Sequence, residues 1–377
     1  MKILIDARLY GLENAGLGRY EINLVRELIR LDSSNSYVIL LRKKYFYNLS
    51  LPANWKKVLA DFRHYSLKEQ LLLPYLLYRE KADLVHFPHF NIPLFYFGNF
   101  IVTIHDLIMH HFSRDNTSTL PWYLFWIKRI MYKMVFGKAV KKASKIIVPS
   151  KEVKNDVLYY YPIIDKDKIV YTYEGYEAKE YSNIEPNKVL NKFNLKKPYF
   201  IYFGNVYPHK NISFLIEGIR KYNLEIGELK LILSSPRNIF FQRLKKLVAD
   251  TKTEKYVKLP GFISDEDISV LLKNSVGFIY PSLLEGFGLQ GLEAMVAGTL
   301  LLASDIPVFK EIYGNKAIYF DPQDHDSLLV ALKKALKMGK NERLERLEQA
   351  REFVKRYSWS KMARETLEVY EESGHCL

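Results

Sequence analysis

Short apolar runs alternate with longer segments of mixed polarity along the 377-residue chain. Runs of this kind, separated by helical or loop segments, are typical of parallel strands buried on both faces of a sheet. In the first half they read KILIDA, YVILL, DLVHF, FIVTIH and KIIVPS, and in the second half YFIYFG, LKLILSS, YVKLPG, VGFIYPS and TLLLAS. Each half therefore predicts an α/β domain, a Rossmann-like, doubly wound parallel sheet covered by helices.

Helical periodicity lies between these runs, and we expect helices near residues 18–31, 212–222, 265–274 and 289–297. A last helical segment, about 341–372, carries Trp359 as its apolar anchor. The polar stretch 173–198 contains Pro186 and separates the two halves. The sequence therefore predicts two domains, 1–180 and 181–358, with a C-terminal helix of about 359–377 packing back on the first.

Composition favours a folded globular protein, with 48% hydrophobic and 26% charged residues. The one cysteine, Cys376, excludes an internal disulfide or a thiolate metal site. The apolar run before Asp6 is too short for a signal-peptide core, so we expect an intracellular protein. Residues 84–105 carry no Asp, Glu, Lys or Arg, but Pro88 and Pro93 divide them into strand, loop and strand.

The formal charge of +14 is uneven, because ten basic residues lie between Arg114 and Lys154 against two acidic ones. On a helix, the segment LPWYLFWIKRIMYKMVFGKAVKKASK places cations and aromatics on one side, and an anionic membrane surface attracts that combination. The alternative is a solvated helix whose aromatics pack under another segment. The expected core face consists of Tyr123, Ile127, Ile130, Met131, Met134 and Val135. The other face carries Tyr132 and the expected membrane contacts, which are Trp122, Phe125, Lys128, Arg129, Lys133 and Phe136.

The segment FGNVYPHKN joins an apolar run to a helix that begins near Ile212. Free amide groups and the positive end of the helix dipole suit a phosphate, and Lys210 adds a point charge. The alternative is an ordinary strand-to-helix turn with a solvated lysine.

The segment EGFGLQGLEAMVAG holds Glu285 in a loop and Glu293 one turn into the following helix. Its glycines, Gly286 and Gly288, allow a ligand close to the backbone, and the amides from Gly286 to Leu289 can cradle a diphosphate or a sugar. The alternative makes both acids favourable charges near a helix N-terminus. That alternative explains neither the two glycines nor the second phosphate-type loop.

Two sites in the first half are further candidates. Gly16 and Gly18 precede an amphipathic helix, but position 21 is Glu21 instead of the third glycine of a dinucleotide fingerprint, so the pair indicates only a close ligand approach. His105 ends a buried strand, where it either bonds a sugar hydroxyl or is satisfied by backbone.

Metal sites find little support in the sequence. Three D-x-D triplets occur, at residues 165–167, 265–267 and 324–326, but they stand at turns or helix starts and are interpreted as structural. The histidines at 86, 89, 110 and 111 lack the spacing of a known metal site. We therefore expect no metal.

GLGRY, TIHDL, FGNVYPHKN and EGFGLQGLEAMVAG, in this order, resemble the retaining glycosyltransferases of family 4 (group 1), possibly a mannosyltransferase-like member. The similarity covers nearly the whole chain, and the pair Glu285 and Glu293 is its most specific element. It implies the GT-B fold, two Rossmann-like domains facing a cleft, with an acceptor-binding first domain and a nucleotide-sugar-binding second domain.

The resemblance also implies roles for single residues. Glu285 would orient the donor sugar and His105 would contact the reacting centre, as the two catalytic residues. Lys210 would neutralise the diphosphate and Glu293 would hold the ribose. The remaining substrate-binding residues would be Gly16, Gly18, Asn205, Gly286, Phe287, Gly288 and Leu289.

One position departs from the family pattern. Many members have an arginine where this chain has Asn205. Either His209 or Arg19 compensates for the missing cation, or the backbone amides carry more of the binding.

The resemblance implies transfer of a hexose, with mannose from GDP-mannose as the first candidate, without a cofactor. The acceptor would be a lipid-linked or membrane-presented glycan of a cell-surface polysaccharide, and the enzyme would lie at the inner face of the membrane. A sugar-nucleotide epimerase or a phosphorylase-like enzyme of the same fold is the alternative. A basic nucleic-acid-binding protein is more remote, because only the charge and the neighbouring aromatics suggest it.

Overall fold

The computed structural model describes residues 1–111, 122–176 and 184–374, and these form two compact units. Unit 1 comprises residues 1–107, 118–175 and 357–377, and unit 2 comprises residues 108–117 and 176–356. Cys376 and the side chain of Trp122 lie outside the described part. No helix within the described residues combines the length and the apolar character needed to cross a membrane.

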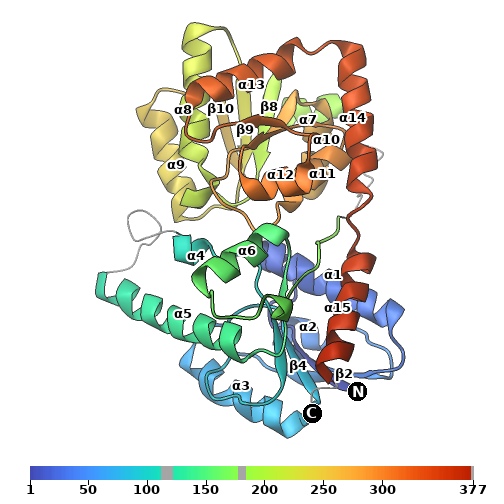
Figure 1. Cartoon of the computed structure of the whole chain (residues 1–377). Helices are drawn as coiled ribbons and strands as arrows, with labels where there is room; N and C mark the ends of the chain where they lie inside the picture. Colours follow the sequence, from blue (N-terminus) through green and yellow to red (C-terminus); the bar gives the residue numbers. More distant parts are fainter. Residues whose placement is uncertain (112–121, 177–183, 375–377) are drawn as a thin grey trace. The chain divides into compact units, whose positions relative to one another are not determined.

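Unit 1 is built on a seven-stranded parallel sheet with the order β3-β2-β1-β4-β5-β6-β7 (Figure 1). Apart from Lys2, its central strands are buried, which explains their largely apolar sequences. Register is parallel at every pair, for example with Ile5 opposite Ile39 on one side and His86 on the other. The strands are β1 (Lys2–Asp6), β2 (Ser36–Leu41), β3 (Trp55–Leu59), β4 (Leu84–Phe87), β5 (Phe100–Thr103), β6 (Ile146–Val148) and β7 (Ile169–Tyr171).

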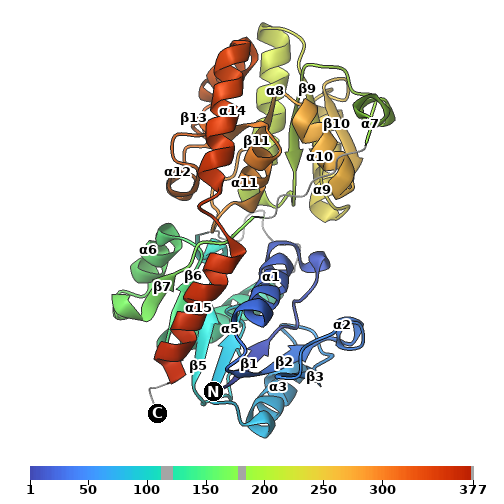
Figure 2. The ribbon, with the colours of Figure 1, turned by 90° about the vertical axis from the view of Figure 1, so that its right-hand side faces the viewer.

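Helices cover both faces of this sheet. On one face α1 and α15 lie side by side in front of the strands (Figure 2), where the Tyr370 hydroxyl bonds His86 at 2.7 Å. On the other face α3, α5 and α6 share one buried cluster. The helices are α1 (Ala15–Leu31), α2 (Lys43–Phe46), α3 (Leu67–Glu80), α5 (Trp122–Lys142), α6 (Lys151–Tyr160) and α15 (Trp359–Gly374), with short 3-10 turns at Leu12–Asn14 and Lys166–Lys168.

Unit 2 repeats the architecture with a six-stranded parallel sheet of order β10-β9-β8-β11-β12-β13. Its strands are β8 (Tyr199–Phe203), β9 (Lys230–Ser234), β10 (Val257–Gly261), β11 (Gly277–Tyr280), β12 (Leu300–Ser304) and β13 (Ile318–Phe320). Its helices are α7 (Pro186–Lys192), α8 (Ile212–Glu225), α9 (Ile239–Asp250), α10 (Asp265–Asn274), α11 (Leu289–Val296), α12 (Pro307–Tyr313), α13 (His325–Lys337) and α14 (Lys340–Val354), with the 3-10 turn Pro208–Lys210; the short α4 (Ile108–His111) groups with this unit. The predicted α/β class with two doubly wound parallel sheets is confirmed.

Three strands were not predicted from the sequence, and all three lie at the edges of their sheets. β3 carries Lys56 and Lys57 between its buried residues, and β7 and β13 are only three residues long. Edge strands are short and half exposed, so they lack the apolar runs that identify central strands. The polar stretch between the domains likewise contains an unexpected helix, α7.

The C-terminal segment, expected to be helical over about 341–372 with a last helix from about 359, consists of α14 and α15 separated at residues 355–358. The chain re-enters unit 1 at Tyr357, and the Trp359 side chain is buried there. A Cβ atom on Gly175 would lie 2.1 Å from the Trp359 backbone nitrogen, so the two segments can approach this closely only because residue 175 is glycine.

The orientation predicted for α5 is wrong. Phe136, expected at the surface, is fully buried against Phe90 and Tyr161, and Tyr132 is buried beside it. Because α5 is apolar on both sides, its periodicity could not decide which side faces the sheet. Of the expected core residues only Val135 is buried, while Tyr123, Ile127, Ile130, Met131 and Met134 are exposed. Of the expected membrane contacts Lys128 and Lys133 are exposed, and Phe125 and Arg129 are partly buried.

Candidate active site

The strand order of unit 2 reverses between β8 and β11, which are neighbours in the sheet. In doubly wound sheets ligands bind outside the carboxyl ends of the strands at this switch point, because the flanking loops diverge there. The loop after β8 carries Lys210 and the loop after β11 carries Glu285. The topology therefore brings together two residues that the sequence singled out separately.

Lys210 and Glu285 form an ion pair, with the lysine Nζ 2.5 Å from Oε1 of the carboxylate. The Ser282 hydroxyl donates to the same oxygen at 2.7 Å. Both charged side chains are largely enclosed, at 12% and 9% exposure. Burial alone would raise the pKa of Glu285, but the Lys210 ammonium and these hydrogen bonds lower it below its usual value. The site thus holds an ionised carboxylate beside an ammonium.

Backbone contacts hold the two loops together. The Leu283 amide donates to the His209 carbonyl at 2.8 Å, and Lys210 itself ends the 3-10 turn that precedes α8. Asn211 follows with a left-handed φ of 58° and caps α8 while its side-chain amide donates to the Pro322 carbonyl at 2.8 Å. Asparagine tolerates this conformation better than most residues. The local sequence therefore positions Lys210 rigidly at the helix start.

His209, one candidate for the cation that Asn205 lacks, is uncharged near pH 7 in this structure. Burial and the neighbouring Lys210 lower the pKa of His209 to about 4, so its ring is neutral near pH 7. Asn205 is partly buried, and its carbonyl accepts a bond from the Tyr202 hydroxyl at 2.5 Å.

The conformation of the glycine-rich turn before α11 depends on its contact with Tyr313. Gly288 has a φ of +100°, and a Cβ atom there would lie 2.2 Å from the Tyr313 hydroxyl oxygen. That hydroxyl donates to the Gly288 carbonyl at 2.5 Å. Gly286 and Phe287 are buried. The need for glycine at 288 therefore comes from Tyr313 as well as from any ligand on the opposite side.

Leu289 and Glu293 complete the predicted donor residues of unit 2. Leu289 is the first residue of α11, and Glu293 lies one turn further along it, partly buried. Glu293 therefore rises from the element that directly follows the loop of Glu285.

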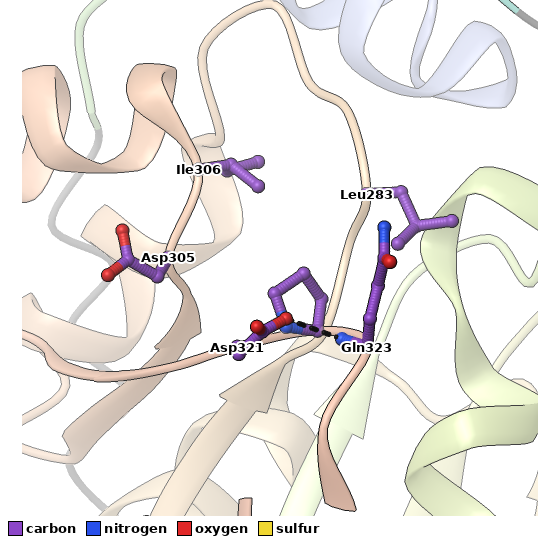
Figure 3. A pocket seen from close by; sticks show the side chains of 6 residues that line it. Leu283, Asp305, Ile306, Asp321 and Gln323 are labelled. Carbon is purple, nitrogen blue, oxygen red and sulfur yellow. Dashed lines mark hydrogen bonds between the residues drawn. The ribbon is translucent and has the colours of Figure 1, made fainter. Parts of the chain in front are cut away.

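A cavity of about 510 Å³ opens beside these loops at the same edge of the sheet. Residues that follow β11, β12 and β13 line it, and Figure 3 shows the Gln323 side chain extending towards Leu283. The Asp321 carboxylate accepts the Gln323 backbone amide at 2.8 Å. Lys210, Glu285 and Glu293 do not line this cavity, but the backbone bonds of Leu283 and Pro322 connect its wall to the loop of Lys210.

In unit 1, His105 follows β5 with both ring nitrogens engaged. Its Nε2 lies 2.9 Å from the Pro88 carbonyl oxygen, and its Nδ1 lies 3.2 Å from a Glu174 carboxylate oxygen. The edge of the ring packs on Tyr20 at 4.7 Å between centroids. A histidine so placed ties three segments of unit 1 together, and it can bond a substrate only by giving up one of these partners.

Gly16 and Gly18 lie within the first turn of α1, which begins at Ala15 instead of the expected residue 18. A Cβ atom on Gly18 would lie 1.8 Å from the Gly11 carbonyl oxygen, so this glycine is required for packing. Gly16 is exposed, and a Cβ atom there would meet nothing within 4 Å. Of the two glycines, only Gly16 has free space around its Cα atom that a ligand could occupy.

A buried polar network that the sequence patterns did not indicate lies at the switch point of unit 1, between β1 and β4. The Arg8 guanidinium bonds both carboxylate oxygens of Asp6 and one of Glu69, each at 2.7 Å. The Asn91 side-chain amide bonds both oxygens of Glu69 at 2.8 Å. Asp6, Arg8 and Asn91 stand between apolar neighbours in the sequence, and Glu69 stands between Lys68 and Gln70 in α3. Only the folded strand order brings the four together.

Aromatic side chains border this network. His89 packs on Phe90 at 4.1 Å between ring centroids, and Tyr65 lies 6.1 Å from His89 and is mostly exposed. Burial lowers the pKa of His64 to about 3, so this ring is neutral near pH 7. Neutral rings of this kind suit the apolar faces of sugar rings.

The other candidates are structural. His86 bonds Tyr370 and Thr103 inside the core of unit 1. Asp165 and Asp324 cap their helices, but Ser264, and not Asp265, caps α10. Within the described residues, no three His, Cys, Asp or Glu side chains group in a way that could hold a metal ion.

Comparison with known proteins gives two family matches. The model described as Glycosyltransferase Family 4 matches residues 15–180, and the model described as Glycosyl transferases group 1 matches residues 183–353. Among curated relatives, the O-antigen chain mannosyltransferase RfbU of Salmonella typhimurium is 27% identical over 70% of this chain and 67% of its own length. The O-antigen chain mannosyltransferase B of Escherichia coli is 26% identical over 98% of this chain and 99% of its own.

Solved structures share the fold. The Anabaena HepE structure in complex with UDP and glucose has a TM-score of 0.73 at 14% identity, covering 98% of this chain and 99% of that chain. WaaG, a glycosyltransferase involved in lipopolysaccharide biosynthesis, has a TM-score of 0.71 at 13% identity over 98% and 99% of the two chains. At such identities the likeness shows the GT-B fold alone.

Proposed function

Because this chain belongs to the group 1 glycosyltransferases of family 4, we propose that it transfers a hexose with retention from a nucleotide-diphospho-sugar to a glycan acceptor of a cell-surface polysaccharide. The observation that carries the proposal is the meeting of Lys210 and Glu285 at the switch point of the unit 2 sheet. Two relatives named as mannosyltransferases of O-antigen chains support mannose as the sugar, with GDP-mannose as the donor to test first.

The chemistry of the bond explains why these two side chains are suited to it. Cleavage of a sugar–phosphate bond builds positive charge on the anomeric carbon and negative charge on the departing diphosphate. The Lys210 ammonium and the amides at the start of α8 and α11 stabilise the leaving group. The Glu285 carboxylate, kept ionised by its surroundings, stabilises the sugar. These residues supply the charge that a metal ion would otherwise provide, so we propose that transfer needs no metal.

We propose that Glu293 extends the donor site along α11 towards the nucleotide ribose, and that Gly16 and His105 of unit 1 also bind substrate. We propose that the acceptor binds at the switch point of unit 1, beside Tyr65 and His89. The acceptor is a lipid-linked or otherwise membrane-presented glycan, and the enzyme works at the inner surface of the membrane.

The donor site is tested by two substitutions in one assay. Purified protein is incubated with GDP-mannose in EDTA, and hydrolysis or transfer is followed by release of GDP. Glu285→Gln and Lys210→Ala should each reduce turnover by about 100-fold or more, as the loss of a charged group at a transition state does.

The matched controls are Lys221→Ala and Asp326→Asn, which break an ion pair of 2.6 Å in the same unit but at its surface. Both controls should retain nearly full turnover. Full activity of either site variant would remove the assignment of these side chains. Interconversion of the sugar nucleotide without an acceptor would instead indicate an epimerase.

A further inference from the structure

Unit 1 presents an apolar surface outside its core. Leu73 and Leu77 of α3 and Phe136 and Val140 of α5 belong to one buried cluster with Val85 of the sheet. Both helices therefore pack on the same face of that sheet, and Figure 1 shows them on the same side of it. Their outer sides point away from the sheet in the same direction.

The outer side of α5 is apolar although nothing in unit 1 covers it within the described residues. Trp126, Ile127, Ile130 and Met134 are between 50% and 57% exposed. They follow one another at helical spacing, opposite the buried Phe136. A contiguous exposed stripe of this size marks a surface that meets an apolar partner.

The same surface continues over α3 and the loop that follows β4. Leu71 and Tyr75 of α3 are 70% and 62% exposed, and Phe97 of the loop is 78% exposed. The Phe97 backbone amide donates to the Tyr78 hydroxyl at 2.9 Å, which joins the loop to α3.

Lys138 joins the same loop to α5. Its ammonium donates to the carbonyls of Leu94 and Tyr96 at 2.5 and 2.7 Å and lies 4.5 Å from the centre of the Phe97 ring. The outer sides of α3 and α5 and residues 93–97 therefore form one continuous surface, here named the α3–α5 face.

The exposed charges of these two helices are all basic within the part the structure describes. α5 contains no Asp or Glu, and its Lys128 and Lys133 are exposed. The two acids of α3 are buried, Glu69 with Arg8 and Glu80 with surface cations, whereas Lys68 is exposed. The α3–α5 face thus combines large apolar side chains with positive charge only.

We propose that the α3–α5 face binds the anionic interface of a lipid bilayer. Such an interface accepts apolar side chains at the boundary of headgroups and acyl chains and attracts each nearby cation to its phosphates. A second copy of the chain would oppose cations to cations, and a nucleic acid would leave the aliphatic side chains in water. The inference rests on the proposed function in one respect: the membrane-presented acceptor is the reason why the enzyme would bind a membrane.

Vesicle co-sedimentation of the full chain tests the proposal. The probes are vesicles of phosphatidylcholine alone and vesicles with about one third phosphatidylglycerol, at low and high salt. We expect binding to the anionic vesicles that weakens with salt. The double variants Trp126→Ser/Ile130→Ser on α5 and Leu71→Ser/Phe97→Ser on α3 and the loop should each lower the partition coefficient by about tenfold or more.

Phe262→Ser/Val330→Ser is the matched control, because it removes two apolar side chains of similar exposure from unit 2. It should bind vesicles as the unchanged protein does. Lys128→Gln/Lys133→Gln should weaken binding to anionic vesicles and leave the weak binding to neutral vesicles unchanged.

Three outcomes would overturn the proposal: no binding by the unchanged protein, equal losses in the control, or a dimer in light scattering that the α5 variant abolishes. Hydrolysis of GDP-mannose in solution should be the same in all of these variants. A failed donor assay with intact vesicle binding would contradict the proposed function alone, and the reverse result would contradict the membrane surface alone.

Discussion

Lys210 and Glu285 neutralise each other in a site that is proposed to receive two phosphate groups. Because the pair is enclosed, removing either partner leaves a charge without compensation. A donor diphosphate would share the ammonium of Lys210 and so free the carboxylate of Glu285 to face the developing charge on the sugar. The ion pair would thus hold both charges in place until a donor binds.

His209, beside this pair, makes the stability of unit 2 depend on pH. Its pKa is about 4 in the folded chain and near 6.5 in the unfolded chain, so the unfolded state binds more protons between these values. Its contribution is present above pH 6.5 and is lost as the pH falls towards 4. We expect His209→Gln to remove up to about 3 kcal/mol of this pH dependence, measured by urea unfolding at about pH 7 and about pH 4.5.

His325→Gln serves as the control, because this histidine belongs to the same unit and its side chain is only partly buried, at 33% exposure. It should unfold with the pH dependence of the unchanged protein. If His209→Gln also keeps the full dependence, burial is not what holds its ring neutral.

At the scale of elements, the two glycines at the N-terminus of α1 have different roles: Gly18 is required for packing, whereas Gly16 has open space around it. Gly18→Ala places a methyl group against the Gly11 carbonyl oxygen and should destabilise unit 1 by about 1–3 kcal/mol. Gly16→Ala meets nothing and should stabilise the helix by about 0.5–1 kcal/mol. Thermal unfolding measures both changes.

Activity of the same pair then tests the proposed contact of Gly16 with the donor. We expect Gly16→Ala to lose transfer activity in spite of its greater stability, since the added methyl group would occupy the space the ligand needs. A stable and fully active Gly16→Ala would contradict that contact.

The network around Arg8 joins the end of β1, the start of α3 and the loop after β4. Replacement by Arg8→Gln leaves the carboxylates of Asp6 and Glu69 buried without a cation, and it should cost about 3–5 kcal/mol. Arg42→Gln breaks an exposed pair with Asp61 and should cost less than about 1 kcal/mol. Urea unfolding of unit 1 compares the two, and equal losses would mean that the network is not structural.

The sequence predicted those elements that are determined by interactions between residues close together in the chain. Central strands such as β1 have an apolar middle, Ile3 to Ile5, because both faces are covered. The helix α10 was predicted with its observed bounds, since the acidic residues at 265–267 mark its start, although Ser264 is the residue that caps it. The buried face of α5 was mispredicted. Both sides of this helix are apolar, so only its packing against the sheet determines which side is buried. The network of Arg8 could not be predicted, because its members meet only through the strand order.

At the scale of the whole molecule, the chain crosses between the units more than once. α15 returns to unit 1, where the hydroxyl of the buried Tyr370 hydrogen-bonds His86, while α14 remains in unit 2. Each unit has a core of its own, so we expect calorimetry to resolve two unfolding transitions. Tyr370→Ala should lower the free energy of unfolding of unit 1 by about 3–5 kcal/mol and leave the transition of unit 2 unchanged.

A donor ligand should act on the other transition. If GDP-mannose binds at Lys210 and Glu285, a concentration of about 100 times its dissociation constant stabilises unit 2 by about 2.7 kcal/mol. For a unit of this size that corresponds to a rise of about 5–10 °C in its midpoint, and Lys210→Ala should abolish the rise. Because Tyr370→Ala identifies the unit 1 transition independently, a ligand that raised that transition instead would place the donor at the switch point between β1 and β4 and reverse the proposed roles of the two units.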